Sequence, residues 1–378
     1  MTQDFYKFHS SLCAPMPAHT NNVSTMIELA ANIKVWGAEL GFQQVGITDV
    51  ALQEHEARLN QWLANGYHGE LGYMAHHGSK RSHPEELLPG TLRVISVRLD
   101  YLTTQARVSK HEQQAQNAQV SRYALGRDYH KLMRKRLAKL AEKIDAQAHQ
   151  HGCRAFVDSA PVMERALAEK SGLGWIGKNT MLLNREAGSY FFLGEIFTNL
   201  ALPLDEVEPK SHCGNCTACL DICPTQAFVA PYVLDARKCI SYLTIELKGP
   251  IPEPLRPKVG NRIFGCDDCQ TICPWNRFAQ LSNEADFQPR HGLDSAQLIE
   301  LFNWTEEEFL EKTAGSAIRR AGYEGWLRNI AVALGNAPPD ARILNALSAK
   351  QSHSSELVRE HVNWALAQHT NKHHIKPE

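Results

Sequence analysis

His212-Cys213-Gly-Asn-Cys216-Thr-Ala-Cys219-Leu-Asp-Ile-Cys223-Pro224 is the stretch that decides the fold of this 378-residue chain. A lone Cys239 follows, and then comes Gly265-Cys266-Asp-Asp-Cys269-Gln-Thr-Ile-Cys273-Pro274. Eight of the ten cysteines lie in these segments, so we expect the region to bind metal through thiolates. The first run has the spacing C-x2-C-x2-C-x3-C-P, which is typical of bacterial-type iron–sulfur binding.

The spacing predicts which thiolates act together. Two-residue gaps let one tight loop present three thiolates to three corners of a cubane cluster, while the cysteine before the proline points away and suits a second cluster. We therefore expect two [4Fe–4S] clusters. The first takes Cys213, Cys216, Cys219 and Cys273, and the second takes Cys223, Cys239, Cys266 and Cys269. Because Cys239 is detached from the second run, the inserted segment builds something other than a plain ferredoxin.

Two other uses of the cysteines are weighed against clusters. Structural zinc sites also use four thiolates each, but they pair C-x2-C knuckles and do not need this longer run. Disulfides are disfavoured because residues 1–22 are polar and lack the apolar core of an export signal. No apolar run approaches the roughly 20 residues of a membrane span. We expect a cytoplasmic protein without membrane contact.

The pattern of the rest of the chain predicts three regions behind a flexible leader, 1–22. Helices expected at 24–40, 51–64, 131–149 and 162–170 alternate with strands at 42–50, 92–99, 154–158, 180–183 and 190–202, which indicates an α/β domain over 23–204. The polar segment 105–120 reads as an exposed excursion. A ferredoxin-like domain is expected at 205–285. Residues 290–378 are helical and suggest HEAT-like repeats packed on the body.

The glycine-rich segment Gly172-Leu-Gly174-Trp175-Ile176-Gly177-Lys178-Asn179 fails two known fingerprints. It follows a helix, so it is not the dinucleotide-binding turn, and Asn179 replaces the Ser or Thr of a P-loop. Its amides and Lys178 suit an anionic or carbonyl-rich ligand. The alternative is a tight turn packed on Trp175.

Asp158 is the candidate general acid. It ends an expected strand, and strand ends in α/β sheets face the ligand crevice. Partial desolvation by Pro161 and Met163 is expected to raise its pKa. The alternative is that Asp158 caps the helix that Pro161 opens. Glu164 and Arg165 are placed either to pair with each other or to orient Asp158.

Taken together, these motifs resemble the epoxyqueuosine reductase family, which acts in the last step of queuosine synthesis in tRNA. The resemblance rests on Arg122-Tyr-Ala-Leu-Gly-Arg-Asp-Tyr-His130, Asp158-Ser-Ala-Pro-Val-Met-Glu-Arg165, the glycine-rich segment, Gly188-Ser189, the eight cysteines, and Arg328-Asn329 through Gly335-Asn336. It covers about residues 24–370. It implies a nitroreductase-like α/β domain that binds cobalamin beside the clusters.

The resemblance also implies roles for particular residues. Asp158 matches the proton donor. Cobalamin contacts are expected at Arg81, Arg122, Asp158, Met163, Gly174, Trp175, Ile176, Gly177, Lys178, Asn179, Ser241, Thr244 and Glu246. A tRNA with a GUN anticodon is expected to lie on the helical region, at Arg319, Arg320, Tyr323, Trp326 and Arg328. Because the formal net charge is -1, any RNA contact must come from such local patches.

An external low-potential donor of flavodoxin or ferredoxin type and a monomeric state are also implied. Two other functions remain open at this point. A ferredoxin-type electron carrier would need no ligand loop and no buried acid. A reductive dehalogenase acting on a small molecule usually carries an export signal, which is not seen here.

Overall fold

The computed structural model describes residues 23–104, 114–148, 152–158, 160–207 and 211–374. The expected leader at 1–22 lies outside the described residues, and so does most of the expected excursion, 105–113.

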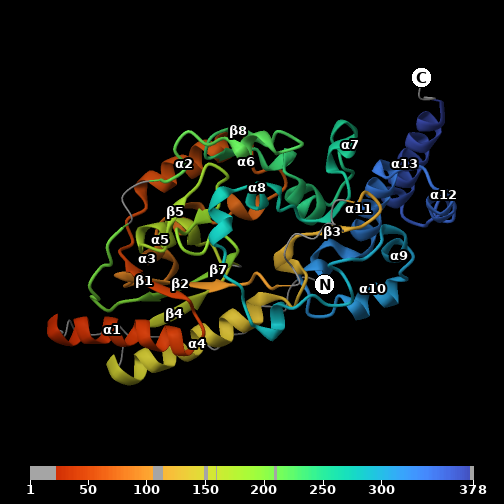
Figure 1. The fold of residues 1–378 in the computed structure, drawn as a ribbon. Helices are drawn as coiled ribbons and strands as arrows, with labels where there is room; N and C mark the ends of the chain where they lie inside the picture. Colours follow the sequence, from red (N-terminus) through yellow and green to blue (C-terminus); the bar gives the residue numbers. More distant parts are fainter. Residues whose placement is uncertain (1–22, 105–113, 149–151, 159, 208–210, 375–378) are drawn as a thin grey trace.

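A four-stranded sheet forms the centre of the first region (Figure 1). Its order is β1 (Gln44–Thr48), β2 (Arg93–Asp100), β7 (Phe191–Thr198) and β4 (Cys153–Phe156), and each neighbouring pair is antiparallel. The alternation of helices and strands was read correctly, but it does not determine strand direction. The argument that strand ends in α/β sheets face the ligand crevice holds for parallel strands, so it does not apply to Asp158.

Helices cover both faces of this sheet. Helices α1 (Val23–Glu39) and α4 (Tyr129–Ala148) pack together on one face, while α5 (Glu164–Lys170) packs on the other (Figure 1). The apolar positions of α1 and α4 recur every three or four residues, which gives each helix one buried stripe: Met26, Leu29, Ile33, Met133, Leu137, Leu140 and Ile144. The connecting elements of this region are α2 (Gln53–Ala64), η1 (Gly72–Met74), η2 (Gly78–Arg81) and α3 (Pro84–Leu87).

The glycine-rich segment forms a short hairpin. Strand β5 (Trp175–Ile176) pairs antiparallel with β6 (Leu182–Leu183), so a strand lies inside the segment that was expected to be a loop. Gly174 has a φ of 153°, and a Cβ at this position would lie 2.0 Å from the Leu183 carbonyl oxygen. Only glycine fits this crossing of two backbones.

The cysteine-rich region consists of short elements. They are α6 (Ala218–Asp221), β8 (Phe228–Ala230), β9 (Val233–Leu234), η5 (Ala236–Lys238), the π-helix η6 (Tyr242–Glu246), η7 (Glu253–Leu255), α7 (Arg256–Val259), β10 (Arg262–Phe264), α8 (Asp268–Thr271), η8 (Pro274–Phe278) and η9 (Ala285–Phe287). Helices α6 and α8, which carry related motifs, pack against each other.

The described end of the expected excursion is not exposed. Strand β3 (Gln119–Val120) pairs in parallel with β10, and η4 (Arg122–Ala124) follows it. Ala118 and Val120 are buried. The prediction was wrong here because the partner strand lies about 140 residues further along the chain, where local polarity gives no hint of it.

The C-terminal region is helical, as expected. It contains α9 (Leu298–Phe302), α10 (Glu306–Lys312), η10 (Ala317–Ala321), α11 (Gly322–Asn336), α12 (Ala341–Ser348) and α13 (Glu356–His374). Helix α11 is buried over 326–335 because it packs against α13 on one side and against β10 and η6 on another. The region therefore rests on the cysteine-rich region through α11 (Figure 1).

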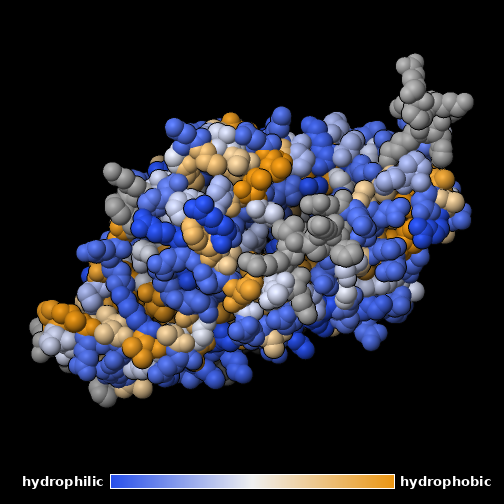
Figure 2. Space-filling view, viewed as in Figure 1, coloured by the Kyte–Doolittle hydropathy of each residue, from blue (hydrophilic) through white to orange (hydrophobic). Residues whose placement is uncertain are grey.

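The surface is mainly hydrophilic in the view of Figure 2, and apolar side chains gather at the α1 end. The described residues there include Val23, Ile27 and Val35, which are exposed. Within the described part of the chain, no helix combines the length and the apolar character that a membrane crossing requires.

Candidate active site and cluster-binding cysteines

The four cysteines expected to hold the first cluster lie together. Cys213, Cys216, Cys219 and Cys273 line one cavity of about 200 Å³. Helix packing explains how this happens, because Cys219 lies in α6 and Cys273 follows α8. Burial and the three neighbouring thiols raise the pKa of Cys219 to about 11. Thiolates this close repel one another, and a bound cation relieves that repulsion.

The four cysteines expected to hold the second cluster also interact with one another. Burial raises the pKa of Cys239, and the nearby Cys223 raises it further. The pKa values of Cys266 and Cys269 are raised by burial first and then by neighbouring groups that include Cys239. The side chain of Cys269 is also close to Cys219, so the two groups are neighbours. Cys216, in the first group, is the exposed member of the eight.

The glycine-rich hairpin is bound to the cysteine loops. Lys178 Nζ donates to the carbonyl oxygens of Gly214 and Cys216 at 2.7 and 2.9 Å. Asn179 Nδ2 donates to the Cys269 carbonyl at 3.1 Å. Trp175 is buried and packs edge-to-face on Trp275. The structure therefore uses the polar ends of Lys178 and Asn179 to hold both cysteine runs.

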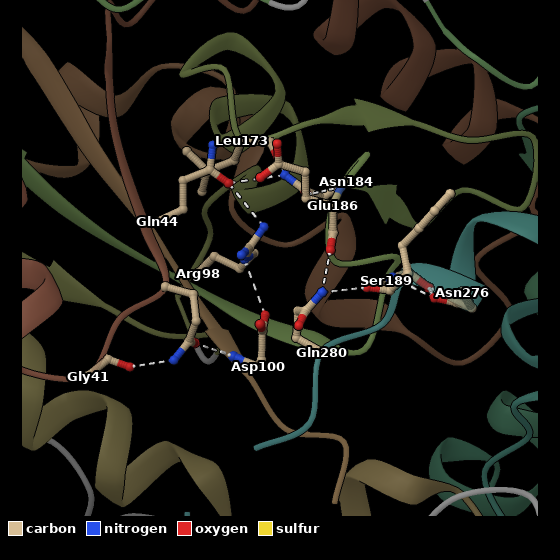
Figure 3. A network of polar contacts seen from close by, with 12 residues as sticks. Gly41, Gln44, Arg98, Asp100, Leu173, Asn184, Glu186, Ser189, Asn276 and Gln280 are labelled. Carbon is tan, nitrogen blue, oxygen red and sulfur yellow. Dashed lines mark hydrogen bonds and ion pairs between the residues drawn. The ribbon is translucent and has the colours of Figure 1, made fainter. Parts of the chain in front are cut away.

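A polar network continues this contact into the central sheet (Figure 3). Gln44 Oε1 accepts from Arg98 Nη1 at 3.1 Å and from Asn184 Nδ2 at 3.0 Å. On the side of the cysteine-rich region, the Ser189 amide donates to Asn276 Oδ1 at 2.7 Å. Arg98 also lies 3.2 Å from Asp100, whose pKa burial raises to about 6. The network couples β1 and β2 to the segment just after Cys273.

Asp158 lies in a hydrogen-bonded group rather than at a helix cap. Its Oδ2 accepts from Tyr129 Oη at 3.1 Å and faces His130 Nε2 at 3.2 Å. The other ring nitrogen of His130 lies 2.6 Å from Asp128 Oδ1. Helix α5 begins at Glu164 and has no side-chain cap, so the capping alternative is wrong. Asp158 has a φ of 48°, a left-handed conformation that few non-glycine residues adopt.

The pKa of Asp158 was expected to be raised, but in the structure it is lowered. Burial acts to raise its pKa, but the hydrogen bond and the charge of His130, with help from Tyr129, bring the pKa below its usual value. Although burial alone would lower the pKa of His130, its two carboxylate neighbours raise it to about 9. At neutral pH the proton of this group therefore resides on His130.

Two further carboxyls stand behind Asp158. Glu164 Oε1 accepts the Asp158 backbone N–H at 2.5 Å, so Glu164 orients Asp158 through its main chain. Burial and the nearby Asp158 raise the pKa of Glu164 to about 7. Glu195 in β7 faces Glu164 and is fully buried, so its pKa is raised well above the usual value. Arg165 does not pair by hydrogen bond with Glu164 but donates to the Thr180 carbonyl.

Asp158 belongs to a group of five residues whose charges act on one another, and we call the place where they lie the recess: Tyr73, Arg81, Asp158, Glu246 and Arg320. Arg320 Nη1 lies 4.0 Å from Glu246 Oε1. Arg81 is 8% exposed; its Nη2 donates to the Tyr73 carbonyl, while its Nε has no hydrogen-bond partner among the described residues.

Other residues expected at the cofactor occupy different places. Arg122 is buried in an ion pair with Asp267, with Nη1 and Oδ2 2.9 Å apart. Thr244 is fully buried, and its hydroxyl donates to the Ile240 carbonyl. The Ser241 hydroxyl donates to the Cys266 carbonyl at 3.5 Å. Met163 is half-buried at the start of α5. Of this set, Arg81, Asp158 and Glu246 share the recess.

Two of the residues expected to contact tRNA cannot do so. Trp326 is 0% exposed, and its Nε1 donates to the Leu301 carbonyl. Arg328 is 1% exposed and donates to main-chain carbonyls around η6. These predictions were wrong because both residues lie on the buried side of α11. Arg319 and Arg320 are exposed and Tyr323 is half-buried, so contact there stays a prediction.

Sequence reasoning assigned no role to Tyr129, His130 or Glu195. Tyr129 and His130 close the motif that begins at Arg122, but only the fold brings them to Asp158. Glu195 could have been recognised from the sequence, because it is a carboxylate in the middle of the apolar strand Phe191–Thr198. A charged residue in a buried strand is rare without a partner or a function.

Comparison with known proteins identifies the family. A profile described as "Epoxyqueuosine reductase QueG, DUF1730" matches residues 81–159, and one described as "4Fe-4S double cluster binding domain" matches residues 212–276. An epoxyqueuosine reductase of Pseudomonas aeruginosa is 66% identical over 341 residues, which are 90% of this chain and 94% of that protein. This chain belongs to the epoxyqueuosine reductase family. The Escherichia coli member is 59% identical, over 90% of this chain and 89% of its own length.

Solved structures of the same family agree. Epoxyqueuosine reductase from Streptococcus thermophilus is 27% identical with a TM-score of 0.80, covering 93% of this chain and 92% of its own. An epoxyqueuosine reductase with an epoxyqueuosine-modified tRNA-Tyr stem loop is 26% identical with a TM-score of 0.76, covering 92% of this chain and all of its own. These matches confirm the expected multidomain fold, and the 4Fe-4S profile over residues 212–276 confirms iron–sulfur binding.

Proposed function

We propose that this chain is an oxidoreductase that reduces epoxyqueuosine to queuosine in tRNA. The observation that carries the proposal is identity of 66% to an epoxyqueuosine reductase over nine-tenths of the chain. The related structure with a modified tRNA stem loop supports tRNA as the substrate. A monomer in the cytoplasm, where tRNA is found, is part of the proposal.

The reaction sets what the site must supply. Removing the epoxide oxygen leaves an alkene and releases water, so each turnover consumes two electrons and two protons. The electrons come from an external low-potential donor of flavodoxin or ferredoxin type. The chain must therefore conduct electrons to the epoxide and deliver protons to the oxygen that leaves.

Two [4Fe–4S] clusters are proposed as the path of the electrons. The thiols fit them, because Cys213, Cys216, Cys219 and Cys273 line one cavity and Cys223, Cys239, Cys266 and Cys269 interact as a second group. Lys178 and Asn179 hold the loops of both runs. Cys239 is followed directly by η6, whose Glu246 reaches the recess.

Cobalamin is proposed at the Asp158 recess, and the residues present fit such a group. A buried Arg81, whose Nε has no hydrogen-bond partner among the described residues, offers a donor to an amide or phosphate oxygen. Arg81, Met163, Ser241 and Glu246 are the residues that would hold it. When bound, cobalamin supplies low-valent cobalt that collects single electrons for cleavage of the carbon–oxygen bond.

The proposed proton path runs through Asp158. Its carboxylate lies at the recess, and His130 faces it with a proton that the two flanking aspartates stabilise. A proton passed from His130 Nε2 to Asp158 Oδ2 makes Asp158 the acid that protonates the leaving oxygen. Tyr129 Oη holds the same carboxylate oxygen in place at 3.1 Å.

The tRNA is proposed to approach from the helical region. Arg319 and Arg320 are exposed at η10, and Arg320 also reaches Glu246 at the recess. One end of this arginine pair can therefore contact phosphate while the other faces the site where the modified base reacts. A tRNA with a GUN anticodon is the proposed substrate.

The decisive test is an anaerobic turnover assay with reconstituted protein, cobalamin, a strong reductant and tRNA that carries epoxyqueuosine. Mass spectrometry of the digested tRNA should show loss of one oxygen, and only when cobalamin is present. Intact epoxyqueuosine in a sample whose iron content confirms both clusters would refute the function and favour an electron carrier.

The role of Asp158 is tested in the same assay with Asp158→Asn. The amide keeps the size of the side chain but cannot pass a proton, so we expect turnover to fall by about 100-fold or more. Iron content and cobalamin binding should be unchanged. Retained turnover would remove Asp158 from the proton path.

A further inference from the structure

Glu195 is buried and Glu164 is half-buried, and the mechanism above leaves both carboxyls unused. We propose that they form a carboxyl pair that holds one proton between them and returns it to Asp158 during each turnover. The pair would supply the second of the two protons that the reaction consumes, the first coming from His130. This inference rests on the proposed function and adds a proton source to the same site.

The position of the pair favours this role. Glu164 Oε1 is 2.5 Å from the Asp158 backbone nitrogen, so one member of the pair contacts the residue proposed as the acid. Glu195 lies in the central strand β7, on the side covered by α5, and faces Glu164. Its neighbour across the sheet is Ser96 in β2.

The hydrogen bonding around Glu195 requires a proton within the pair. Both Glu195 carboxyl oxygens are buried, and neither accepts a hydrogen bond from an N–H or O–H group among the described residues. The facing Glu164 carboxylate offers only acceptors when ionised. Two ionised carboxylates in contact inside a protein are strongly disfavoured, so one of the two carries a proton. The raised pKa values of Glu164, about 7, and of Glu195, higher still, agree with this.

The charged groups around the pair do not replace that proton. Asp158 acts on both carboxyls as a like charge. His130 lowers the pKa of Glu164, but it is the smallest of the contributions named, and its ring nitrogens already face two aspartates. Glu164 interacts with the charges of Arg81 and Arg165, but Arg81 donates to the Tyr73 carbonyl and Arg165 to the Thr180 carbonyl. Arg98 on β2 is paired with Asp100.

The transfer balances over one turnover. Asp158 gives its first proton to the leaving oxygen and becomes a carboxylate, and a proton from the pair restores the acid form. The pair becomes a dianion for a moment, which its burial opposes, and His130 is left neutral, so the pair and His130 each take one proton from solvent before the next turnover. Two protons and the two electrons from the clusters then account for the alkene and the water.

Glu195→Gln separates this proposal from a structural role. The amide keeps the shape of the side chain and a donor for Glu164, but it cannot release a proton. Glu164 must then hold the proton alone and loses it at a lower pH than the wild-type pair, in which Glu195 has the more strongly raised pKa. We divide the single-turnover rate at pH 6 by the rate at pH 8.5. This ratio should be about fivefold or more higher in the variant than in the wild-type protein.

Ser96→Ala is the matched control, because it alters the side chain opposite Glu195 without changing a titratable group. Its rate ratio should equal that of the wild-type protein. An unchanged ratio in Glu195→Gln, or the same change in Ser96→Ala, would overturn the proposal.

A second measurement does not depend on turnover. Infrared spectra of the wild-type protein at pH 8.5 should contain the band of a protonated carboxyl, and Glu195→Gln or Glu164→Gln should lose it. Absence of that band from the wild-type protein would overturn the pair. Failure of the proposed function would instead appear as wild-type protein that leaves epoxyqueuosine intact.

Discussion

Asp158 and His130 show how a site can contain the expected acid with an unexpected ionisation. The carboxyl sits at the recess, but the hydrogen bond from His130 keeps its pKa low and places the proton on the imidazole. In the proposed mechanism the acid is therefore a pair of residues, in which Asp158 faces the substrate and His130 holds the proton. Asp128 on the far side of the ring stabilises the same proton.

His130→Gln tests this division. The amide can still bond to Asp158 but holds no extra proton, so we expect turnover to fall by about 10- to 100-fold. Because the folded-state pKa of His130 is raised, its contribution to stability is present in full below about pH 6.5, the usual pKa of histidine. That contribution is lost as the pH rises through about 9.

The measurement is thermal unfolding of both proteins between pH 6 and pH 10. The wild-type protein should exceed His130→Gln by about 1–3 kcal/mol at pH 6, and the difference should shrink towards pH 10. A difference that does not vary with pH would mean that His130 is neutral in the folded protein.

At the scale of elements, α11 fixes the segment that leads from Cys239 to the recess. Arg328 donates to the carbonyl oxygens of Leu243, Leu247 and Gly249, each at 2.7 Å. Asn329 Nδ2 adds a bond to the Thr244 carbonyl at 2.8 Å. A π-helix leaves its last carbonyls without helical partners, so these side chains take the place of a cap. Burial lowers the pKa of Arg328 to about 10 without removing its charge at neutral pH.

Arg328→Ala is expected to destabilise the protein by about 3 kcal/mol or more, since it removes a buried cation and leaves one buried and two part-buried carbonyls without this donor. Arg319 is exposed on η10, so Arg319→Ala is the matched control and should change stability by no more than about 0.5 kcal/mol. Denaturant or thermal unfolding measures both.

For tRNA affinity the order of the two variants should be reversed, with Arg319→Ala affected and Arg328→Ala unaffected. Arg319→Ala should weaken tRNA binding with a smaller salt dependence, whereas folded Arg328→Ala should bind tRNA like the wild-type protein. If folded Arg328→Ala lost tRNA affinity, the conclusion that Arg328 does not contact tRNA would be wrong.

At the scale of the whole molecule, the cysteine groups join segments that are distant in sequence. Cys273 lines the cavity of Cys213, Cys216 and Cys219, and the hairpin residues Lys178 and Asn179 bind the loops of both runs. The first region therefore helps to hold the cysteine-rich region in the shape that the clusters need.

Cys273→Ser should damage the cluster held by Cys213, Cys216 and Cys219 and release roughly half of the bound iron. Cys153→Ser is the control, because Cys153 lies in β4 outside both groups. Iron analysis and electron paramagnetic resonance of the reduced protein distinguish the two clusters. Selective loss of the other cluster would contradict the proposed ligand sets.

The sequence by itself determined the metal chemistry, the helical tail and most helix and strand positions. These features depend on spacing and periodicity within short segments, such as Cys213 to Cys223 or the apolar stripe of the helix beginning near Tyr129. The position of Asp158 as a candidate acid also came from its local motif. Local patterns survive folding because the side chains that define them act within a few turns or strands.

Only the tertiary structure decided the direction of the strands, the ionisation of Asp158 and the burial of Trp326 and Arg328. The pKa of a carboxyl depends on which donors the fold brings within hydrogen-bond distance, and His130 is 28 residues away in the chain. Burial likewise depends on which face of α11 meets another element. Both are properties of long-range packing, so no window of sequence around these residues contains them.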